Sequence, residues 1–198
     1  TDPVVNLLTG QTAENLAVRF GVTREQMDAF SVRSHQRVAA GQDAGHYGEV
    51  VPLVGRDGQV YAADDGVRRD SSMAGLAKLK PFFDRKYGKV TPGNSSQITD
   101  GGVWLVLASE EAVQRHGLQP IGRIADSQWA GLDPAQMGLG PVHAATPILQ
   151  RHGLGLVERG VALAAGLGVG GQGLLQLVSQ AEVVDHQAAG LVLEHPVD

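Results

Sequence analysis

A polar loop that leads into an apolar run is the stretch of this sequence best suited to contact a ligand. It comprises residues 90–102, which read VTPGNSSQITDGG. Pro92 and Gly93 break the segment before it, and amide and hydroxyl groups then gather over residues 94–96, where they offer hydrogen-bond donors and acceptors. Gly101 and Gly102 let the backbone turn or approach another group closely. Composition alone leaves two interpretations open, a ligand-facing loop and a simple turn.

The residue types that are missing limit the chemistry. The chain has no cysteine, which excludes disulfides, thiolate metal sites and a cysteine nucleophile within these residues. The sequence contains no nucleophile-elbow motif, so nothing in it indicates a Ser-His-Asp hydrolase. Six of the histidines show no metal-ligand spacing, so surface or capping roles are expected and no metal site is predicted: His35, His46, His116, His143, His152 and His186.

Composition is typical of a soluble globular protein. The 198 residues are 42% hydrophobic and 19% charged, enough for one hydrophobic core or two small ones. A net charge of −5 without a lysine or arginine cluster argues against nucleic acid or an anionic membrane as the main partner. No apolar run has the length of a membrane span and no N-terminal signal is present, so the expected location is cytoplasmic.

Helices and a hairpin are expected before the loop. A short helix is predicted over residues 12–20 with Thr12 as its N-cap, and a capping box at residues 23–26 begins a second helix that runs to about Gly41. Residues 49–54 are typical of a strand, and a turn at residues 56–59 predicts a hairpin. One or two helical turns are expected over residues 74–80. Phe82 and Phe83 follow, with local core packing as the simplest interpretation.

An α/β pattern is expected after the loop. Residues 103–108 form a continuous apolar run typical of a buried strand, and Ser109 caps a helix that Gly117 ends. Residues 121–129 alternate well enough for another strand, which makes a crossover in an α/β sheet. A further helix is predicted from Thr146 to near Gly153.

Several separate motifs together resemble the thiolases. They occur in the thiolase order at compatible spacings within residues 7–154, and they read GQTAENLA (10–17), RSHQR (33–37), LAKLKP (76–81), the loop at 93–102 and DPAQMGLGP (133–141). The chain is thus similar to an acetyl-CoA C-acyltransferase. The resemblance implies an incomplete α/β thiolase-like fold with the end of an N-terminal domain, a loop domain and the start of a C-terminal domain. Residues 1–102 hold the first part, with the coenzyme-A-binding loop domain at about 10–83, and residues 103–198 hold the last strand and helix of the N-terminal domain and a degraded C-terminal domain.

The resemblance also implies a chemistry that this chain does not complete. In thiolases a cysteine takes the acyl group from a thioester, and coenzyme A then cleaves the 3-oxoacyl chain; in reverse, acetyl-CoA condenses with the acyl-enzyme. Such steps need a nucleophile, acid/base groups and oxyanion donors. The resemblance places the nucleophilic cysteine upstream of Thr1 and a second cysteine downstream of Asp198.

What the chain does resemble is the coenzyme-A side of the site. Ser96 matches a serine that hydrogen-bonds a pantetheine amide, in the same loop as Asn94, and Phe83 matches an aromatic residue of the pantetheine channel. Met137 matches a methionine of the acyl pocket, with core packing as the alternative. Thr9 and Gly75 depart from the family, standing where many members have methionine and some have a second serine that contacts coenzyme A.

Arg68 matches an arginine near the adenine end of coenzyme A. A cation beside a phosphorylated nucleotide is physically reasonable. The alternative is an exposed arginine that pairs with a neighbouring acid, Asp64, Asp65 or Asp70.

The resemblance weakens after residue 154. Where thiolases carry an Asn/His-Glu-Ala-Phe loop, residues 156–161 read LVERGV. Two explanations are open for residues 155–189, natural divergence and a reading-frame error. Codons GAA-CGA-GGC-GTT for residues 158–161, read one base later, encode Asn-Glu-Ala, so the nucleotide sequence decides between them.

The last residues resemble the thiolase segment whose histidine activates the nucleophilic cysteine. Residues 190–197 read GLVLEHPV, and the resemblance implies His195 as the catalytic base. Glu194 and Asp198 replace family glycines on either side of this histidine. The alternative is a solvated histidine near a terminus.

Two functions follow from these expectations. The first is thiolase-type acyl transfer in fatty acid metabolism, with this chain as a fragment that is inactive alone; the second is a non-catalytic protein that binds coenzyme A or a partner. Coenzyme A or acyl-CoA is the expected partner, as substrate, with no covalently bound cofactor. The full-length family implies a homo-oligomer. Apolar residues at 103–107 are expected to be partly uncovered.

Overall fold

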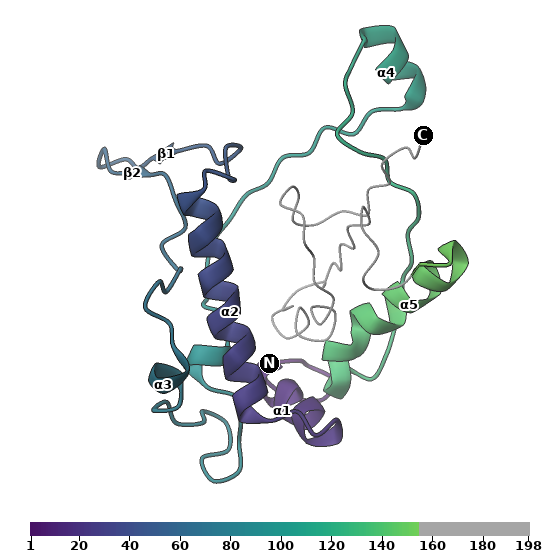
Figure 1. Cartoon of the computed structure of the whole chain (residues 1–198). Helices are drawn as coiled ribbons and strands as arrows, with labels where there is room; N and C mark the ends of the chain where they lie inside the picture. The colour runs from purple at the N-terminus through teal and green to yellow at the C-terminus, as the bar shows by residue number, and fades with distance from the viewer. Residues whose placement is uncertain (155–198) are drawn as a thin grey trace.

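The computed structural model describes residues 1–154 (Figure 1). This part of the chain is mainly helical, and its elements follow one another in this order: α1 (Thr9–Arg19), α2 (Arg24–Asp43), β1 (Leu53–Val54), β2 (Val60–Tyr61), α3 (Met73–Leu76), the 3₁₀ turn η1 (Pro92–Asn94), α4 (Glu110–His116), the 3₁₀ segment η2 (Pro134–Leu139) and α5 (Gly140–His152). The long α2 carries α3 and η1 along one side, whereas α4 stands apart from the other helices.

The predicted N-terminal helices both form, with one shift in bounds. The Thr23 hydroxyl accepts from the Gln26 N–H at 3.2 Å and the Gln26 amide oxygen accepts from the Thr23 N–H at 2.8 Å, which confirms the capping box. α1 begins at Thr9, earlier than predicted, because Gln11 caps the free Leu8 N–H. Thr12 lies inside the helix and its hydroxyl donates to the Thr9 carbonyl. Thr12 is therefore not the N-cap.

The predicted hairpin is confirmed but is shorter than expected. β1 and β2 pair antiparallel, with Leu53 opposite Tyr61 and Val54 opposite Val60. Gly58 adopts φ 83° in the turn, a backbone conformation that glycine accepts without steric cost. Residues 49–52 do not join the strand. All four paired side chains are exposed, so the hairpin contributes little to the core.

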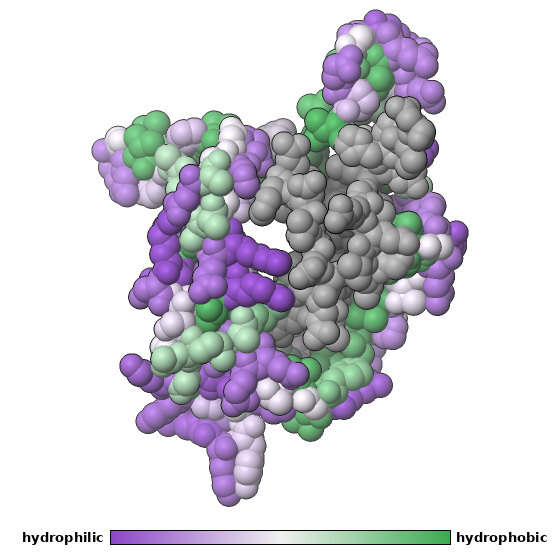
Figure 2. All heavy atoms as spheres, in the orientation of Figure 1, coloured by the Kyte–Doolittle hydropathy of each residue, from purple (hydrophilic) through white to green (hydrophobic). Residues whose placement is uncertain are grey.

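The predicted strands at residues 103–108 and 121–129 are wrong for the chain as described. The first is extended but unpaired, and the second contains only an isolated bridge at Ile124. No neighbouring strand among residues 1–154 offers them hydrogen-bond partners, and a strand needs such partners. Trp104 is 96% exposed, and Figure 2 shows apolar surface where the chain leads into α4.

The last helices follow their predicted stop signals. The Ser109 hydroxyl accepts from the Ala112 N–H, and Gly117 ends α4 in the left-handed conformation, as predicted. α5 begins at Gly140, before the predicted Thr146, since Pro141 suits a first turn. Gly153 ends it with φ 63°.

The core is small and lies where α1, α2 and the loop meet. Ala17, Met27 and Val90 are buried together, with Phe83 packed on them. The core therefore sits directly beneath the polar loop.

No helix within residues 1–154 is long and apolar enough to cross a membrane.

Candidate functional site

The entry to the polar loop is fixed by α1. The Glu14 carboxylate accepts from the Lys89 N–H at 2.8 and 3.0 Å and from the Val90 N–H at 2.8 Å. The Lys89 ammonium donates in turn to the carbonyls of Ala17 at 3.1 Å and Val22 at 2.5 Å. Backbone and side chain of the loop entry are thus both tied to the first helix and its C-terminal turn.

Asn94 holds the loop in its 3₁₀ turn. Its amide oxygen accepts from the Thr91 N–H at 2.8 Å, and its amide nitrogen donates to Asp28 at 3.0 Å and to the Lys89 carbonyl at 2.9 Å. Thr91 is 1% exposed and Asp28 is 2% exposed. The Asn94 amide therefore shapes the loop from inside the protein, and its contact with coenzyme A stays a prediction.

The two serines that follow differ in their freedom. The Ser95 hydroxyl donates to the Thr91 carbonyl at 2.8 Å, which closes the turn. Ser96 is exposed, and its hydroxyl donates only to the adjacent Gln97 carbonyl at 3.1 Å. A ligand amide can replace this weak local bond at little cost. Of the two serines, Ser96 is the one whose hydroxyl is available to a ligand.

Arg68 lies exposed and close to the loop. Its guanidinium forms no ion pair with any residue from 1 to 154, so the alternative pairing with Asp64, Asp65 or Asp70 does not occur there. Its backbone N–H donates to Nδ1 of His35 on α2 at 3.1 Å. The neighbouring Arg69, by contrast, is occupied by Asp43 at 2.9 and 3.0 Å and by Gln42 at 3.0 Å.

Gln97 brings these two regions together. Its side chain lies directly against Gly66, at a position that a Cβ on Gly66 would overlap. Ser96 and Arg68 each lie within two residues of this contact. The structure therefore places the exposed Ser96 and Arg68 on neighbouring segments, and the Arg68 backbone also contacts the half-buried His35.

Phe83 is a core residue as well as a site candidate. Its half-buried ring packs on the cluster of Ala17, Met27 and Val90 and meets Phe82 edge-on, with 5.0 Å between ring centroids. It also lies so close to Gly10 that a Cβ there would overlap the ring. Local core packing is thus confirmed for Phe83, and lining of a pantetheine channel stays a prediction.

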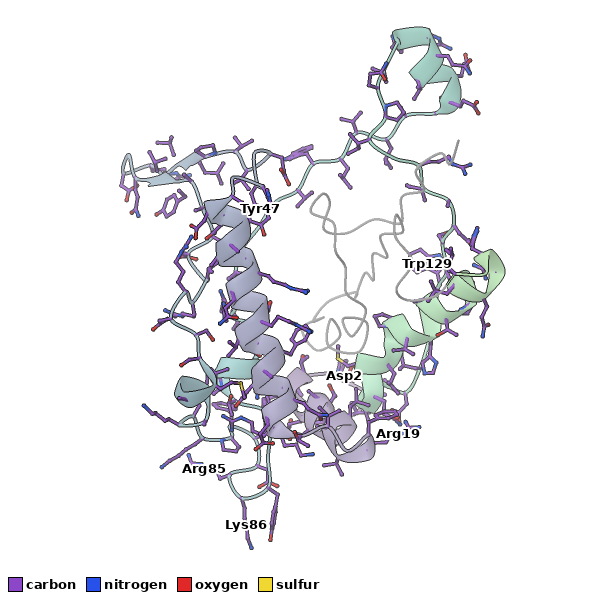
Figure 3. The ribbon with its side chains drawn as sticks, viewed as in Figure 1. Asp2, Arg19, Tyr47, Arg85, Lys86 and Trp129 are labelled. Carbon is purple, nitrogen blue, oxygen red and sulfur yellow. The ribbon has the colours of Figure 1, made fainter. Side chains whose placement is uncertain are left out.

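Met137 lies on η2, away from the loop. Asn15 of α1 donates to the Ala135 carbonyl of η2 at 3.3 Å, which seats this segment on the first helix. Next to Met137, a shallow groove of about 380 Å³ separates the end of α1 from η2 and α5, where Figure 3 shows Arg19. Its lining includes Phe20, Asp133 and His143, and none of the five described site candidates.

A second charged cluster ties α5 to the segment before η2. The Asp126 carboxylate accepts from Arg151 at 2.9 and 3.0 Å and contacts His152 Nε2 at 3.0 Å. The Arg151 hydrogen bond, helped by the Ser127 N–H and His152, holds the pKa of Asp126 below its usual value. Within residues 1–154 no group of three or more histidine and acidic side chains is placed to hold a metal. His195 lies outside the described residues.

Sequence reasoning missed three residues that build the site. No local motif marks Glu14 or Asp28 as a residue that anchors the loop, since their partners lie 66 to 76 residues away. His35 was expected to have a surface or capping role. The i, i+4 spacing of Arg24 and Asp28 was the one local signal, because it predicts an ion pair on α2, which is observed at 2.7 Å.

Comparison with known proteins identifies the motifs. The family model described as "Thiolase, N-terminal domain" matches residues 1–111. An acetyl-CoA acetyltransferase of Chromobacterium violaceum is 39% identical over 199 residues, covering 95% of this chain and 50% of its own length. A 3-ketoacyl-CoA thiolase of Marinobacter nauticus is 42% identical, covering 74% and 39%. The chain spans about half the length of the curated relatives it matches, or less.

Solved structures agree with the sequence matches. An acetyl-CoA acetyltransferase of Bacillus anthracis superposes with a TM-score of 0.74 at 38% identity, covering 78% of this chain and 40% of its own. Human mitochondrial 3-ketoacyl-CoA thiolase in complex with CoA gives 0.69 at 36%, covering 79% and 39%. A dimeric peroxisomal thiolase of Saccharomyces cerevisiae gives 0.73 at 29%, covering 78% and 40%.

Proposed function

The chain belongs to the thiolase family, as its motifs predicted, and on this premise we propose that it supplies the coenzyme-A-binding side of a thiolase-type acyltransferase. The proposed substrates are acyl-CoA thioesters, through thiolysis of a 3-oxoacyl-CoA or condensation of acetyl-CoA. The relatives are an acetyl-CoA acetyltransferase and a 3-ketoacyl-CoA thiolase, which supports this chemistry, and one solved neighbour is a complex with CoA. The fold is thiolase-like and partial.

One observation carries the proposal. The contact of Gln97 with Gly66 places the hydroxyl of Ser96 and the guanidinium of Arg68 on adjacent segments. A hydroxyl suits a pantetheine amide, and a free guanidinium suits a phosphate. One end of the proposed site thus offers neutral hydrogen bonds and the other offers positive charge, which matches the two ends of coenzyme A.

These 198 residues alone cannot carry out acyl transfer in the way that thiolases do. No cysteine is present among the 198 residues to accept the acyl group. We propose that His195 serves as base only when a cysteine from outside these residues faces it. Since one solved neighbour is described as dimeric, we also propose that the whole protein is a homo-oligomer.

The absence of cysteine supports a second candidate function, non-catalytic binding of coenzyme A. An assay of 3-oxoacyl-CoA cleavage separates the two. Activity restored by adding a cysteine-containing thiolase N-terminal segment supports the first function. Binding without activity in that mixture supports the second.

Calorimetric titration of the 198-residue chain with coenzyme A tests the shared claim. We expect saturable binding that weakens about fivefold in Ser96→Ala, the loss of one hydrogen bond. Ser109→Ala is the matched control, because its hydroxyl caps α4 far from the loop. It should reduce stability and leave affinity unchanged. If the unaltered chain gives no heat of binding, the proposed function is contradicted.

A further inference from the structure

Asp28 is a buried carboxylate to which no part of the proposed function assigns a role. It is 2% exposed, on the face of α2 that looks toward the loop. Burying a carboxylate is costly unless its oxygens are paired. Both oxygens of Asp28 are paired, one with Asn94 of the loop and the other with Arg24 on the same helix.

One oxygen holds the loop. Oδ1 accepts from the Asn94 amide at 3.0 Å, and that amide also bonds the Lys89 carbonyl and the Thr91 N–H. These bonds fix η1, from which Ser96 follows two residues after Asn94. Asp28 therefore sets the position from which the Ser96 hydroxyl emerges.

The other oxygen holds the segment around α3. Oδ2 accepts from Arg24 Nε at 2.7 Å, and the two terminal nitrogens of Arg24 donate to the carbonyls of Leu76 at 2.5 Å and Leu79 at 3.2 Å. Arg24 thereby closes the C-terminal end of α3, the helix that follows the Arg68 segment. Charge-assisted bonds of this kind fix the geometry of both partners, and removal of one partner leaves the other charge buried and unpaired.

The two held segments also touch each other. A Cβ on Gly93 of η1 would lie 2.5 Å from a methyl group of Leu76 and 2.6 Å from one of Leu79. The α3 segment and η1 are thus closely packed, so a shift of one displaces the other. Asp28 bonds the η1 side directly through Asn94 and is linked to the α3 side through Arg24.

We propose that Asp28 is the positioning residue of the coenzyme-A site, setting through Asn94 and Arg24 the relative placement of the Ser96 loop and the α3 segment. This rests on the proposed function for the identity of the ligand. Asp28 itself is buried and touches no ligand. Its effect on affinity must therefore pass through the segments that it holds.

A double-mutant cycle in the 198-residue chain tests the proposal, with coenzyme A as the probe in calorimetry. We expect Asp28→Asn to weaken affinity about tenfold and Ser96→Ala about fivefold. The double variant should lose about tenfold in all, because a displaced loop no longer presents Ser96. Independent effects would multiply to about fiftyfold, and that outcome overturns the proposal while the proposed function stands.

Asp126→Asn is the matched control, as the same substitution in an ion pair away from the loop. It should leave affinity unchanged. If Asp28→Asn does not fold, Arg24→Lys provides a milder change that keeps the charge but loses the fork to Leu76 and Leu79. Far-ultraviolet circular dichroism checks the helical fold of each variant.

Amide hydrogen exchange gives a readout that does not depend on the ligand. Asp28→Asn should accelerate exchange of residues 72–79 and 91–97 together, and Asp126→Asn should accelerate neither. Unchanged exchange in those two segments overturns the positioning role. If the unaltered chain does not bind coenzyme A, the proposed function fails, and exchange alone decides the role of Asp28.

Discussion

Glu14 on α1 accepts a hydrogen bond from the Val90 N–H at 2.8 Å, across 76 residues of sequence. The same carboxylate takes the Lys89 N–H with both oxygens. The Glu14 side chain thus supplies the hydrogen-bond acceptors that a neighbouring strand would otherwise offer to the loop entry. It supports the core residue Val90, whose carbonyl accepts from the Phe82 N–H at 2.9 Å.

Removal of this carboxylate should destabilise the whole helical core. We expect Glu14→Ala to lower the free energy of unfolding by about 2 kcal/mol, because two partly buried N–H groups lose their acceptor. Urea denaturation followed by circular dichroism measures it. Glu111→Ala is the control, since Glu111 pairs with Arg115 on the exposed α4, and it should cost less than about 0.5 kcal/mol. Equal losses in the two variants would contradict the anchoring role.

Gly10 should be intolerant of a side chain although it lies in a helix. In open helical positions alanine stabilises relative to glycine by about 1 kcal/mol. Here the added methyl group overlaps the Phe83 ring, so Gly10→Ala should instead lower stability by about 1–3 kcal/mol. Phe83→Leu in the Gly10→Ala background should restore part of the loss. Gly101→Ala, with no atom within 4 Å of the new Cβ, should be close to neutral.

Two neighbouring arginines give a direct test of the anionic end of the proposed site. Arg68→Ala should weaken coenzyme A binding about tenfold, because its guanidinium is not engaged within residues 1–154. Arg69→Ala should leave affinity unchanged, since Asp43 and Gln42 already hold that guanidinium. Affinity of the unaltered chain should also fall as salt rises from about 50 to about 500 mM. Similar losses in both variants would remove Arg68 from the site.

Asp126 should stabilise the fold only while it is ionised. Because Arg151 lowers its folded pKa, its contribution is fully present above the ordinary aspartate pKa of about 3.9 and is lost as pH falls through the lower folded value. Asp126→Asn should therefore lower the urea midpoint at pH 7. The difference from the unaltered chain should shrink in strong acid. A gap for Asp126→Asn that stays constant as pH falls would refute this assignment.

Local signals predicted the helix ends well. The capping box at Thr23 and Gln26, and the Ser109 and Gly117 ends of α4, need only residues a few positions apart, and all form as predicted. The bounds of α1 and α5 were less accurate because Gln11 and Pro141 were not recognised as start signals. Helix ends are set by neighbours that the sequence places side by side.

Long-range structure was harder to predict, in the sheet and in the site. Apolar content identifies residues 103–108 as strand-like, but strand pairing depends on a partner that residues 1–154 do not supply. Motif resemblance predicts Ser96 and Arg68 as coenzyme-A contacts, which stay predictions, and the structure adds that their segments are neighbours. It could not find Asp28, whose partner Asn94 is 66 residues away.

The apolar run at residues 103–107 should make the chain self-associate. All five of its side chains are at least 64% exposed, in an extended and unpaired segment that offers backbone and apolar groups to another copy. Val106→Lys should reduce association in sedimentation velocity without changing helix content, and Val4→Lys, at an isolated exposed valine, should not. Trp104 reports on the same contact: in a Trp129→Phe background its emission should shift to shorter wavelength as concentration rises, because association covers a side chain that is 96% exposed in the monomer. Emission that stays constant over the range in which mass increases would show that the copies meet elsewhere.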